Sequence, residues 1–488
     1  MVNLFQHKLL PPFFWAIVYL FISCTKDKGT PAYEGYPENV GKIVMNQCAV
    51  SGCHNSVSSD ACAGLDLSSW EALFRGSRAN SAVIPYRPDQ SFLLFSINTF
   101  NDLGPKLYPP MPINKSALSR DEVLTIKDWI SQGAPNNEGT IKFSDYTKRR
   151  IYVANQGCDF ISVFDGETKL IARAFDVGNG FNTEAPHDMM VSPDGQYIYV
   201  SFYASNIFQK YRTSDHQKVG EIVLPEYSWH TLDISGDSKI AVTTHLNSSG
   251  KMALIDLDNM KVIVIYQGGG LFIFPHGCAL NHNGSKVYIT SQQGNFIYKV
   301  DMSDPQNPDF SQVVLQPGTV ASPNGIYKPY DVDYFPDYSK YAVTCQGTNE
   351  LRIFNTANDS LLAVINTTGV PQLMSFSEQL PYLFVSCMGD TGNAQAKSGV
   401  DVINYNTFKK ITSIFTGYEP RGITVDDAGK CVWVANRNIS PKGWAPHHTT
   451  TCVGKNGYIT IIDMSTLQLV PNWKAEVSVD PYCISIKK

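Results

Sequence analysis

The sequence predicts two folded parts, a small all-α domain over residues 36–137 and an all-β, seven-bladed β-propeller over residues 147–488. Two observations support this multidomain architecture. Apolar residues recur at helical spacing in the first part, whereas a short phrase returns seven times in the second, at intervals of 42 to 61 residues. The length of 488 residues is sufficient for two or three domains.

The helical prediction depends most on the segment that follows residue 118. Ser119 and Glu122 have the spacing of a capping box, and Gly133 is placed to end the helix that the box begins. A shorter helix is expected earlier, over residues 39–47. The apolar stripe of the later helix consists of Val123, Ile126, Trp129 and Ile130.

The repeated phrase of the second part begins with a proline, or once a tryptophan, followed by a polar residue and a short apolar run. A turn such as Ser192-Pro-Asp-Gly195 and a further apolar strand come next, which is a hairpin signal. Four short strands in about 40–50 residues are typical of one propeller blade. The polar residues of the seven phrases are His187, His230, His276, Tyr330, Gln372, Arg421 and Tyr482.

The two ends of this repeat array complement each other. Residues 151–155 and 161–165 have the pattern of outer strands with no inner strand before them, and residues 482–486 have the pattern of an inner strand alone. Pairing of these pieces would complete one blade and close the ring, so that no long sheet edge stays exposed.

A short motif, Cys48-Ala-Val-Ser-Gly-Cys53-His54, follows the first predicted helix, and Met111 lies later in the proline-rich loop 109–112. Cys-x-x-Cys-His is the common signal for covalent haem attachment, and here four residues separate the cysteines. The motif predicts one haem c bonded to Cys48 and Cys53, with His54 as an axial iron ligand and Met111 as the candidate for the other. A disulfide or a zinc site made from the same Cys and His residues is the alternative, with Met111 as an ordinary core residue.

Two resemblances to known families rest on these residues. Residues 36–137 resemble the c-type cytochrome domains of exported bacterial proteins, including variants with four spacer residues, which implies His54 and Met111 as axial ligands. Tyr152-Val-Ala-Asn155 and Trp433-Val-Ala-Asn436 resemble the bacterial YVTN propeller repeat. The second resemblance implies a fold and says little about activity, because one fold carries many functions.

The first 23 residues are predicted to be a bacterial lipoprotein signal peptide. Lys8 supplies the charged region, residues 13–22 supply an apolar run, and Phe21-Ile22-Ser23-Cys24 resembles a lipobox with phenylalanine where leucine is usual. Lipid on Cys24 would anchor the protein to a membrane without spanning it, and residues 24–35 would form a linker. Plain secretion after cleavage nearby is the alternative, and either places the protein on the periplasmic or cell-surface side.

The composition bears on partners and on redox state. A net charge of −5 at neutral pH argues against nucleic-acid binding through a basic surface. Eight of the eleven cysteines lie outside the haem motif and the lipobox, and in an oxidising compartment some of them are expected to pair. Cys345, Cys431 and Cys483 lie within apolar strand patterns, which favours small buried thiols.

Histidine fills the polar position in three successive phrases, at His187, His230 and His276. Because this residue opens an innermost strand, the three side chains are expected to converge at one mouth of the channel. His245 is expected at the same face, where an insertion over residues 437–457 adds two adjacent histidines. Imidazole binds zinc, copper and haem iron, so a second metal site is one interpretation. The other is a polar plug of these histidines with Tyr330, Gln372, Arg421 and Tyr482 around trapped water.

Three functions are compatible with these patterns. The first is membrane-anchored electron transfer by the haem, with the propeller docking a redox partner protein or a small electron donor or acceptor. The second is a redox enzyme with a metal or cofactor site at the His-lined mouth, and the third is a propeller binding module with an accessory haem. The sequence favours the first, because it requires only the haem motif and the repeats, and it leaves enzymatic activity open.

Overall fold

The computed structural model describes residues 33–180, 183–389, 398–447, 450 and 452–488. The predicted signal peptide, Cys24 of the predicted lipobox and most of the predicted linker lie outside these residues, as does His448. Within the described ranges, no helix is both long enough and apolar enough to cross a membrane.

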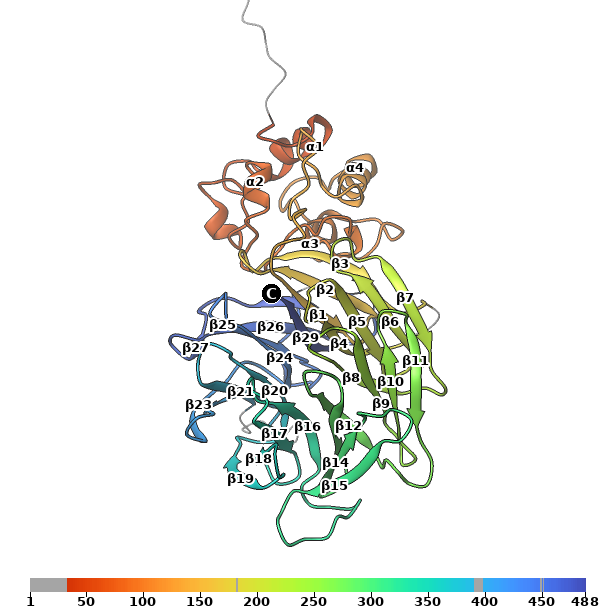
Figure 1. Ribbon diagram of the computed structural model, residues 1–488. Coiled ribbons are helices and arrows are strands. Elements are labelled where there is room, and N and C mark those ends of the chain that lie inside the picture. Colours follow the sequence, from red (N-terminus) through yellow and green to blue (C-terminus); the bar gives the residue numbers. More distant parts are fainter. Residues whose placement is uncertain (1–32, 181–182, 390–397, 448–449, 451) are drawn as a thin grey trace, which may run out of the picture.

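The described chain before the first strand consists of helices joined by long turns (Figure 1). Helix α4 (Arg120–Ser131) begins at the predicted capping box: Glu122 N–H donates to Ser119 Oγ over 3.3 Å, and Ser119 N–H donates to Glu122 Oε2 over 2.8 Å. The helix expected over residues 39–47 is present as α1 (Glu38–Ile43) continued by the π-helical turn η1 (Val44–Cys48). The others are η2 (Ser59–Cys62), α2 (Trp70–Leu73), η3 (Pro88–Gln90) and α3 (Phe92–Ile97).

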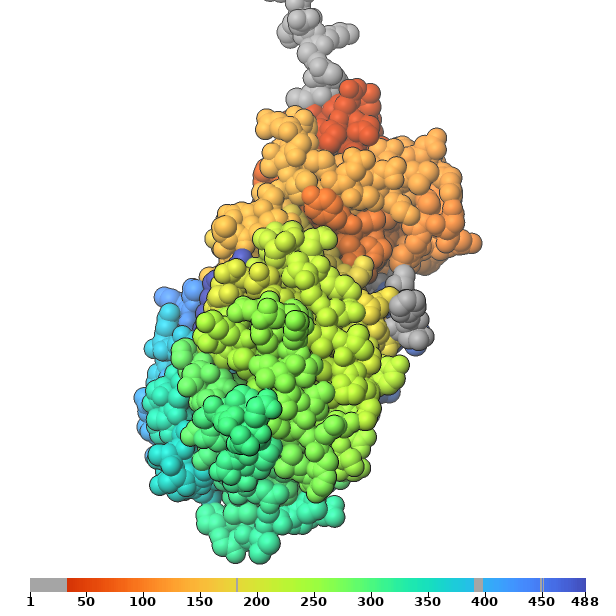
Figure 2. Space-filling view, turned by 45° about the vertical axis from the view of Figure 1, so that its right-hand side comes forward, coloured from red at the N-terminus to blue at the C-terminus, as the bar shows by residue number. Residues whose placement is uncertain are grey.

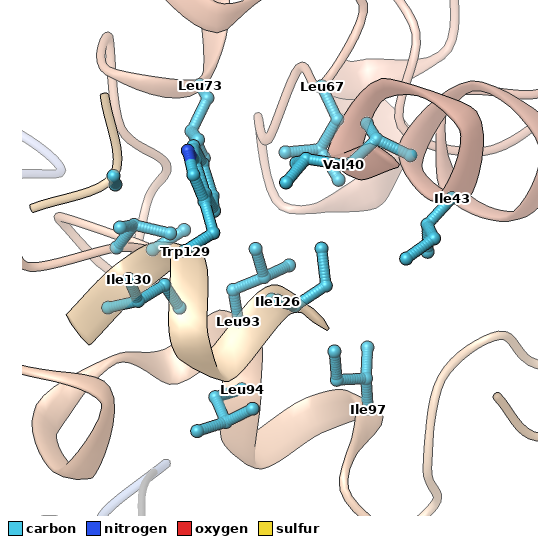
Figure 3. Close-up of a cluster of buried hydrophobic side chains, with 14 of the residues drawn as sticks. Val40, Ile43, Leu67, Leu73, Leu93, Leu94, Ile97, Ile126, Trp129 and Ile130 are labelled. Carbon is cyan, nitrogen blue, oxygen red and sulfur yellow. The ribbon is translucent and has the colours of Figure 1, made fainter. Parts of the chain in front are cut away.

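One apolar cluster holds these helices together (Figure 3). Val40 of α1 and Val123 and Ile130 of α4 are completely excluded from solvent. Burial of such a side chain contributes about 1.5–3 kcal/mol to folding. Indole N–H groups at the edge of the cluster are satisfied, since Trp70 Nε1 donates to Ala134 O over 2.9 Å and Trp129 Nε1 donates to Pro135 O over 2.8 Å.

In the described part of the chain, the strands after residue 149 form seven antiparallel blades, a β-propeller-like fold. Blades 1 and 2 are β29 (Pro481–Lys487), β1 (Arg150–Asn155), β2 (Phe160–Asp165), β3 (Ile171–Asp176), and β4 (Pro186–Val191), β5 (Tyr197–Phe202), β6 (Ile207–Arg212), β7 (Lys218–Val223). Blades 3 and 4 are β8 (Trp229–Ile234), β9 (Ile240–His245), β10 (Lys251–Asp256), β11 (Lys261–Tyr266), and β12 (Pro275–Leu280), β13 (Lys286–Ser291), β14 (Phe296–Asp301), β15 (Asp309–Val314).

Blades 5 and 6 are β16 (Pro329–Tyr334), β17 (Lys340–Cys345), β18 (Glu350–Asn355), β19 (Leu361–Asn366), and β20 (Pro371–Phe376), β21 (Tyr382–Cys387), β22 (Gly399–Asn404), β23 (Lys409–Ile414). Blade 7 contains β24 (Pro420–Asp426), β25 (Cys431–Asn436), β26 (Asn456–Asp463), β27 (Gln468–Leu469) and β28 (Ala475–Val479). Its outer edge differs from the expected single strand, because the long final repeat gives β26 two short partners, β27 and β28.

The blades close into a ring as the sequence predicts. The innermost strands contact one another in the order β29, β4, β8, β12, β16, β20, β24, and β24 contacts β29 again. The C-terminal strand β29 pairs with β1 along its length, from Arg150 opposite Lys487 to Asn155 opposite Pro481. Cys345, Cys431 and Cys483 are buried free thiols within these strands, as expected.

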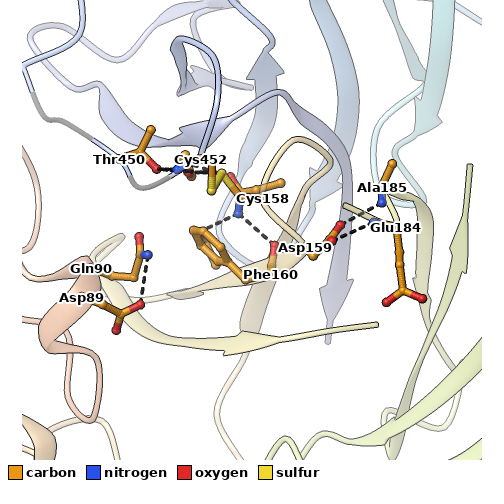
Figure 4. The surroundings of a disulfide bond; sticks show 12 residues. Asp89, Gln90, Cys158, Asp159, Phe160, Glu184, Ala185, Thr450 and Cys452 are labelled. Carbon is orange, nitrogen blue, oxygen red and sulfur yellow. Dashed lines mark hydrogen bonds between the residues drawn. A yellow bond between two sulfur atoms is a disulfide. The ribbon is translucent and has the colours of Figure 1, made fainter. Parts of the chain in front are cut away.

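A disulfide joins the first and last blades at this closure (Figure 4). Cys158, in the turn between β1 and β2, pairs with Cys452, in the insertion that precedes β26. The two residues are 294 positions apart in the sequence. The bond therefore links blade 1 to blade 7 at the seam, which is the point where the ring closes.

The helical part lies at one end of the propeller-like part, against β3 (Figures 1 and 2). Asn80 accepts from Ile171 N–H over 2.9 Å and donates to Lys169 O over 3.1 Å. Arg87 forms an ion pair with Asp176 at 3.1 Å. Ile84 packs into a buried cluster with residues of β1, β25, β26 and β28, so the helical part also covers the seam.

Candidate functional site

The two cysteines of the predicted haem motif are free thiols in adjacent turns. Cys48 ends η1 and packs against the helical core, and His54 N–H donates to Cys48 O over 3.1 Å, which folds the motif back on itself. Burial raises the pKa of the Cys48 thiol to about 11, and the nearby Cys53 thiol adds to the rise. No disulfide joins Cys48 and Cys53, both of which are described.

The imidazole of His54 has one nitrogen engaged. Its Nδ1 lies 3.2 Å from Leu65 O, while its backbone carbonyl accepts from Leu67 N–H over 2.8 Å. An Nδ1–H donor to a carbonyl fixes the tautomer in which Nε2 carries the lone pair. The ring is thereby oriented to offer Nε2 to a metal.

Met111 lies in a loop that is attached to α3 at two points. Leu107 N–H donates to Phe95 O over 2.9 Å, and Met111 N–H donates to Ser96 O over 2.7 Å. The Met111 side chain is half-buried and packs against the helical cluster that Cys48 also contacts. Cys48 and Met111 therefore border the same apolar core from two different segments.

The zinc interpretation of the motif lacks a ligand cluster. Among the described residues, one group of three or more metal-ligating side chains is close enough to share an ion, and it is His187, His230 and His276. Cys48, Cys53 and His54 do not form such a group.

The three histidines stand at the second position of β4, β8 and β12 and converge as expected. Their candidate ligand atoms lie within 4.8 Å of one another, and the rings are buried, with His230 completely excluded from solvent. The ring centres are 4.7 Å apart for His187 and His230, and 5.3 Å apart for His230 and His276. Three adjacent blades thus bring three imidazoles to one side of the ring.

The hydrogen bonds of these histidines are incomplete. His187 Nδ1 lies 3.3 Å from Gln156 Nε2, and His276 Nδ1 lies 3.0 Å from Tyr330 O. Among the described residues, Nε2 of His187 has no hydrogen-bond partner, and His230 makes no hydrogen bond of normal geometry, although the Ser228 backbone lies close enough to oppose the fall in its pKa. Buried polar atoms without partners are rare in native proteins, and each calls for an explanation.

Burial and charge keep these imidazoles neutral. Burial lowers the pKa of His230 to about 3, with Arg421 as the next cause. The pKa values of His187 and His276 also lie well below the ordinary value, first through burial and then through the positive form of His230. The lone pairs are therefore available at neutral pH.

The other four residues of the ring bond to one another in pairs, and Gln372 Nε2 also donates to Val370 O over 2.9 Å. Tyr330 and Tyr482 hydroxyl oxygens are 3.2 Å apart, and Arg421 Nη1 donates to Gln372 Oε1 over 3.3 Å. The Arg421 guanidinium lies over the Tyr482 ring at 3.7 Å from its centre. This part resembles the predicted polar plug, except that Arg421 Nε has no partner, and among the three histidines only the Nδ1 atoms of His187 and His276 have one.

A repeated hydrogen bond, which the repeat pattern alone does not predict, positions the ring. In five blades the penultimate residue of the second strand is Ser or Thr, and its hydroxyl donates to the backbone carbonyl of the ring residue in the next blade. These donors are Ser201 to His230 (2.9 Å), Thr244 to His276 (3.0 Å), Thr290 to Tyr330 (3.2 Å), Thr344 to Gln372 (2.9 Å) and Ser386 to Arg421 (2.7 Å). Ala154 and Ala435 occupy the position in the remaining two blades.

His245 and the insertion lie outside the three-histidine group. His245 ends β9, where its Nε2 is 3.6 Å from the Glu226 carboxylate and its ring packs on Trp229. His447 is exposed, and its Nδ1 lies 3.7 Å from Glu476. The position of its loop at the same face predicts His245 near the other three, but its side chain turns to Glu226 and Trp229 instead.

Comparison with known proteins gives the fold alone. No protein-family model and no curated protein matches the chain. The chain is similar to the crystal structure of a functionally unknown protein from Desulfotomaculum acetoxidans, with 16% identity, a TM-score of 0.51, and coverage of 68% of this chain and 99% of that one. At this identity the likeness supports a shared fold and no shared activity.

Two further solved structures have lower TM-scores. Hydrazine synthase of Kuenenia stuttgartiensis has a TM-score of 0.48 at 16% identity, with coverage of 64% of this chain and 92% of that one. The dihydro-haem d1 dehydrogenase NirN has a TM-score of 0.45 at 10% identity, with coverage of 76% and 88%. Similarity at this level carries no conclusion about what this chain binds.

Proposed function

We propose that this protein is an exported, lipid-anchored c-type haem protein that transfers electrons, and that its propeller-like part docks the redox partner. The orientation of His54 is the observation that carries the proposal. Its Nδ1 is hydrogen-bonded to Leu65 O, so Nε2 is the nitrogen left for iron. In the sequence, His54 directly follows Cys53, and both Cys48 and Cys53 are free thiols. A purely structural role for His54 would not explain the two free cysteines in the six residues before it.

The residues present fit a covalent haem. Cys48 and Cys53 would form its thioether bonds, and His54 and Met111 would be the axial ligands. When bound, the haem supplies one-electron transfer. The apolar core that Cys48 and Met111 share would exclude water from one side of the group, and a Met ligand favours ferrous iron relative to a second His.

An oxidising compartment is supported by the Cys158–Cys452 disulfide. Such bonds persist mainly in exported proteins, where haem attachment to cysteine also takes place. The lipobox-like segment ending at Cys24 supports attachment to a membrane from that side.

Covalent attachment is tested by acid–acetone extraction of protein matured in a host with haem-attachment machinery. The wild type should keep its haem through denaturation and extraction, whereas Cys48→Ser with Cys53→Ser should release or lack it. Cys62→Ser removes a free thiol from the same segment and should behave as the wild type. Haem that extracts freely from the wild type would contradict the proposal.

A further inference from the structure

We propose that His187, His230 and His276 bind one divalent transition-metal ion, copper or zinc, at the mouth of the propeller channel. This inference goes beyond the haem function and is independent of it, because the three residues belong to the inner strands of blades 2, 3 and 4.

The spacing of the three side chains suits a shared ion. Zinc–nitrogen bonds of about 2.0–2.1 Å place two tetrahedral ligands roughly 3.3 Å apart. The candidate ligand atoms already lie within 4.8 Å of one another. A closer approach of about 1.5 Å between the nitrogens, within reach of rotations about the side-chain torsions, would therefore bring all three to bonding distance from one ion.

The orientation of two of the rings is set by hydrogen bonds on their far nitrogens. His276 Nδ1–H donates to Tyr330 O, which leaves the Nε2 lone pair of that ring for an ion. His187 Nδ1 lies 3.3 Å from the Gln156 amide, whose Oε1 has no partner; with that amide turned so that Oε1 accepts from Nδ1–H, Nε2 of His187 is also free for an ion. Metal-bound histidines in proteins ordinarily have such a partner on the other nitrogen. The hydroxyls of Ser201 and Thr244 in turn hold the backbone carbonyls of His230 and His276.

The unpartnered nitrogens of His187 and His230 point to a ligand rather than to a plug. A plug would satisfy its buried polar atoms, as the Tyr330 and Tyr482 hydroxyls do with each other, although Arg421 Nε also lacks a partner. The histidines instead leave three nitrogens without a hydrogen bond of normal geometry among the described residues. One bound ion would satisfy a nitrogen on each of these two rings.

The donor set selects the class of ion. Three neutral imidazoles suit copper and zinc, whereas calcium and magnesium require oxygen ligands that this group lacks. Three protein ligands leave a fourth position for an exogenous group, as in catalytic zinc sites. The Arg421 guanidinium stacks on the Tyr482 ring, whose centre lies 4.1 Å from that of the His187 ring. Its positive charge favours an anion as the exogenous fourth ligand.

The experiment uses the full-length, haem-loaded protein after removal of loosely bound metal with a chelator. Copper(II), zinc and, as an optical probe, cobalt(II) are titrated, and bound metal is expressed per protein chain. We expect one equivalent to bind, and His230→Gln to weaken binding by at least about tenfold. His245→Gln is the matched control, since it removes a buried histidine from the neighbouring strand β9 and should leave binding unchanged.

A second measurement needs no variant, in case the buried substitution prevents folding. Copper(II)-loaded wild type should show electron paramagnetic resonance splitting from imidazole nitrogens. The proposal is overturned if the wild type binds no stoichiometric metal, if His230→Gln folds and binds equally well, or if the copper spectrum shows oxygen ligands. Loss of haem in the Cys48 and Cys53 variants leaves this result unaffected, so the two proposals fail separately.

Discussion

Met111 is the proposed haem residue whose role has the strongest competing explanation. Its side chain packs against the helical core, as an ordinary buried methionine would, and its backbone is held to Ser96 O at 2.7 Å. Met45 packs against the same cluster from η1 and is not a candidate ligand. Comparison of the two methionines therefore separates ligation from packing.

Met111→Ala should abolish the weak near-infrared band of a methionine–iron bond in the ferric protein. The reduction potential should fall by a fraction of the roughly 0.8 V that axial ligands span, because a thioether favours ferrous iron. Absorption spectroscopy and potentiometric titration measure the two effects. Met45→Ala should lower stability and keep the band, and a band that survives Met111→Ala would assign the sixth ligand elsewhere.

The residues of the candidate sites could be predicted from the sequence, whereas the groups that hydrogen-bond to them could not. Cys48, Cys53 and His54 form a local motif, and the repeat places His187, His230 and His276 at one blade position. The Leu65 carbonyl and Gln156 could not be predicted as partners, because loop geometry decides them. The expectation for His245 differs from the structure for the same reason. The sequence predicts the face at which the loop emerges, but it does not predict the direction of the His245 side chain.

At the scale of the strand, the Ser or Thr hydroxyls connect neighbouring blades. Each hydroxyl lies on the second strand of one blade and donates to the backbone of the ring residue in the next blade. The bonds therefore fix the position of each ring residue relative to the blade before it. The two blades with Ala154 and Ala435 flank the closure, where β29 pairing and the disulfide already hold the first and last blades together. The strands were predictable from alternating apolar residues, whereas these bonds require knowledge of blade-to-blade packing.

Thr344→Val should lower the free energy of unfolding by about 1–3 kcal/mol. The substitution keeps the side-chain volume and removes a hydroxyl that donates to the buried carbonyl of Gln372 and accepts from Asp331 N–H, so both backbone groups lose a partner. Urea unfolding monitored by circular dichroism measures the change. Thr412→Val, on the half-exposed part of the outer strand β23, should change stability by far less, and equal effects of the two variants would refute a special role for the hydroxyl.

For the whole molecule, three different contacts converge on the seam between blades 1 and 7. The C-terminal strand β29 pairs with β1, and the disulfide joins the β1–β2 turn to the insertion before β26. Ile84 of the helical part packs into the buried cluster formed by residues of blades 1 and 7. The closing strand could be predicted because the array begins and ends with complementary pieces. The disulfide and the docking of the helical part could not, since both join segments far apart in the sequence.

The disulfide should stabilise this closure by restricting the unfolded chain. Its loop spans 294 residues, and loss of a native disulfide typically costs about 2–5 kcal/mol. Cys158→Ser with Cys452→Ser should therefore lower the urea midpoint of the propeller-like part while haem absorption stays unchanged, because the haem residues lie in the helical part. A thiol reductant should lower the midpoint of the wild type to that of the double variant and leave the variant unaffected. A midpoint in the double variant equal to that of the oxidised wild type would show that β29 pairing and the Ile84 contact hold the ring closed by themselves.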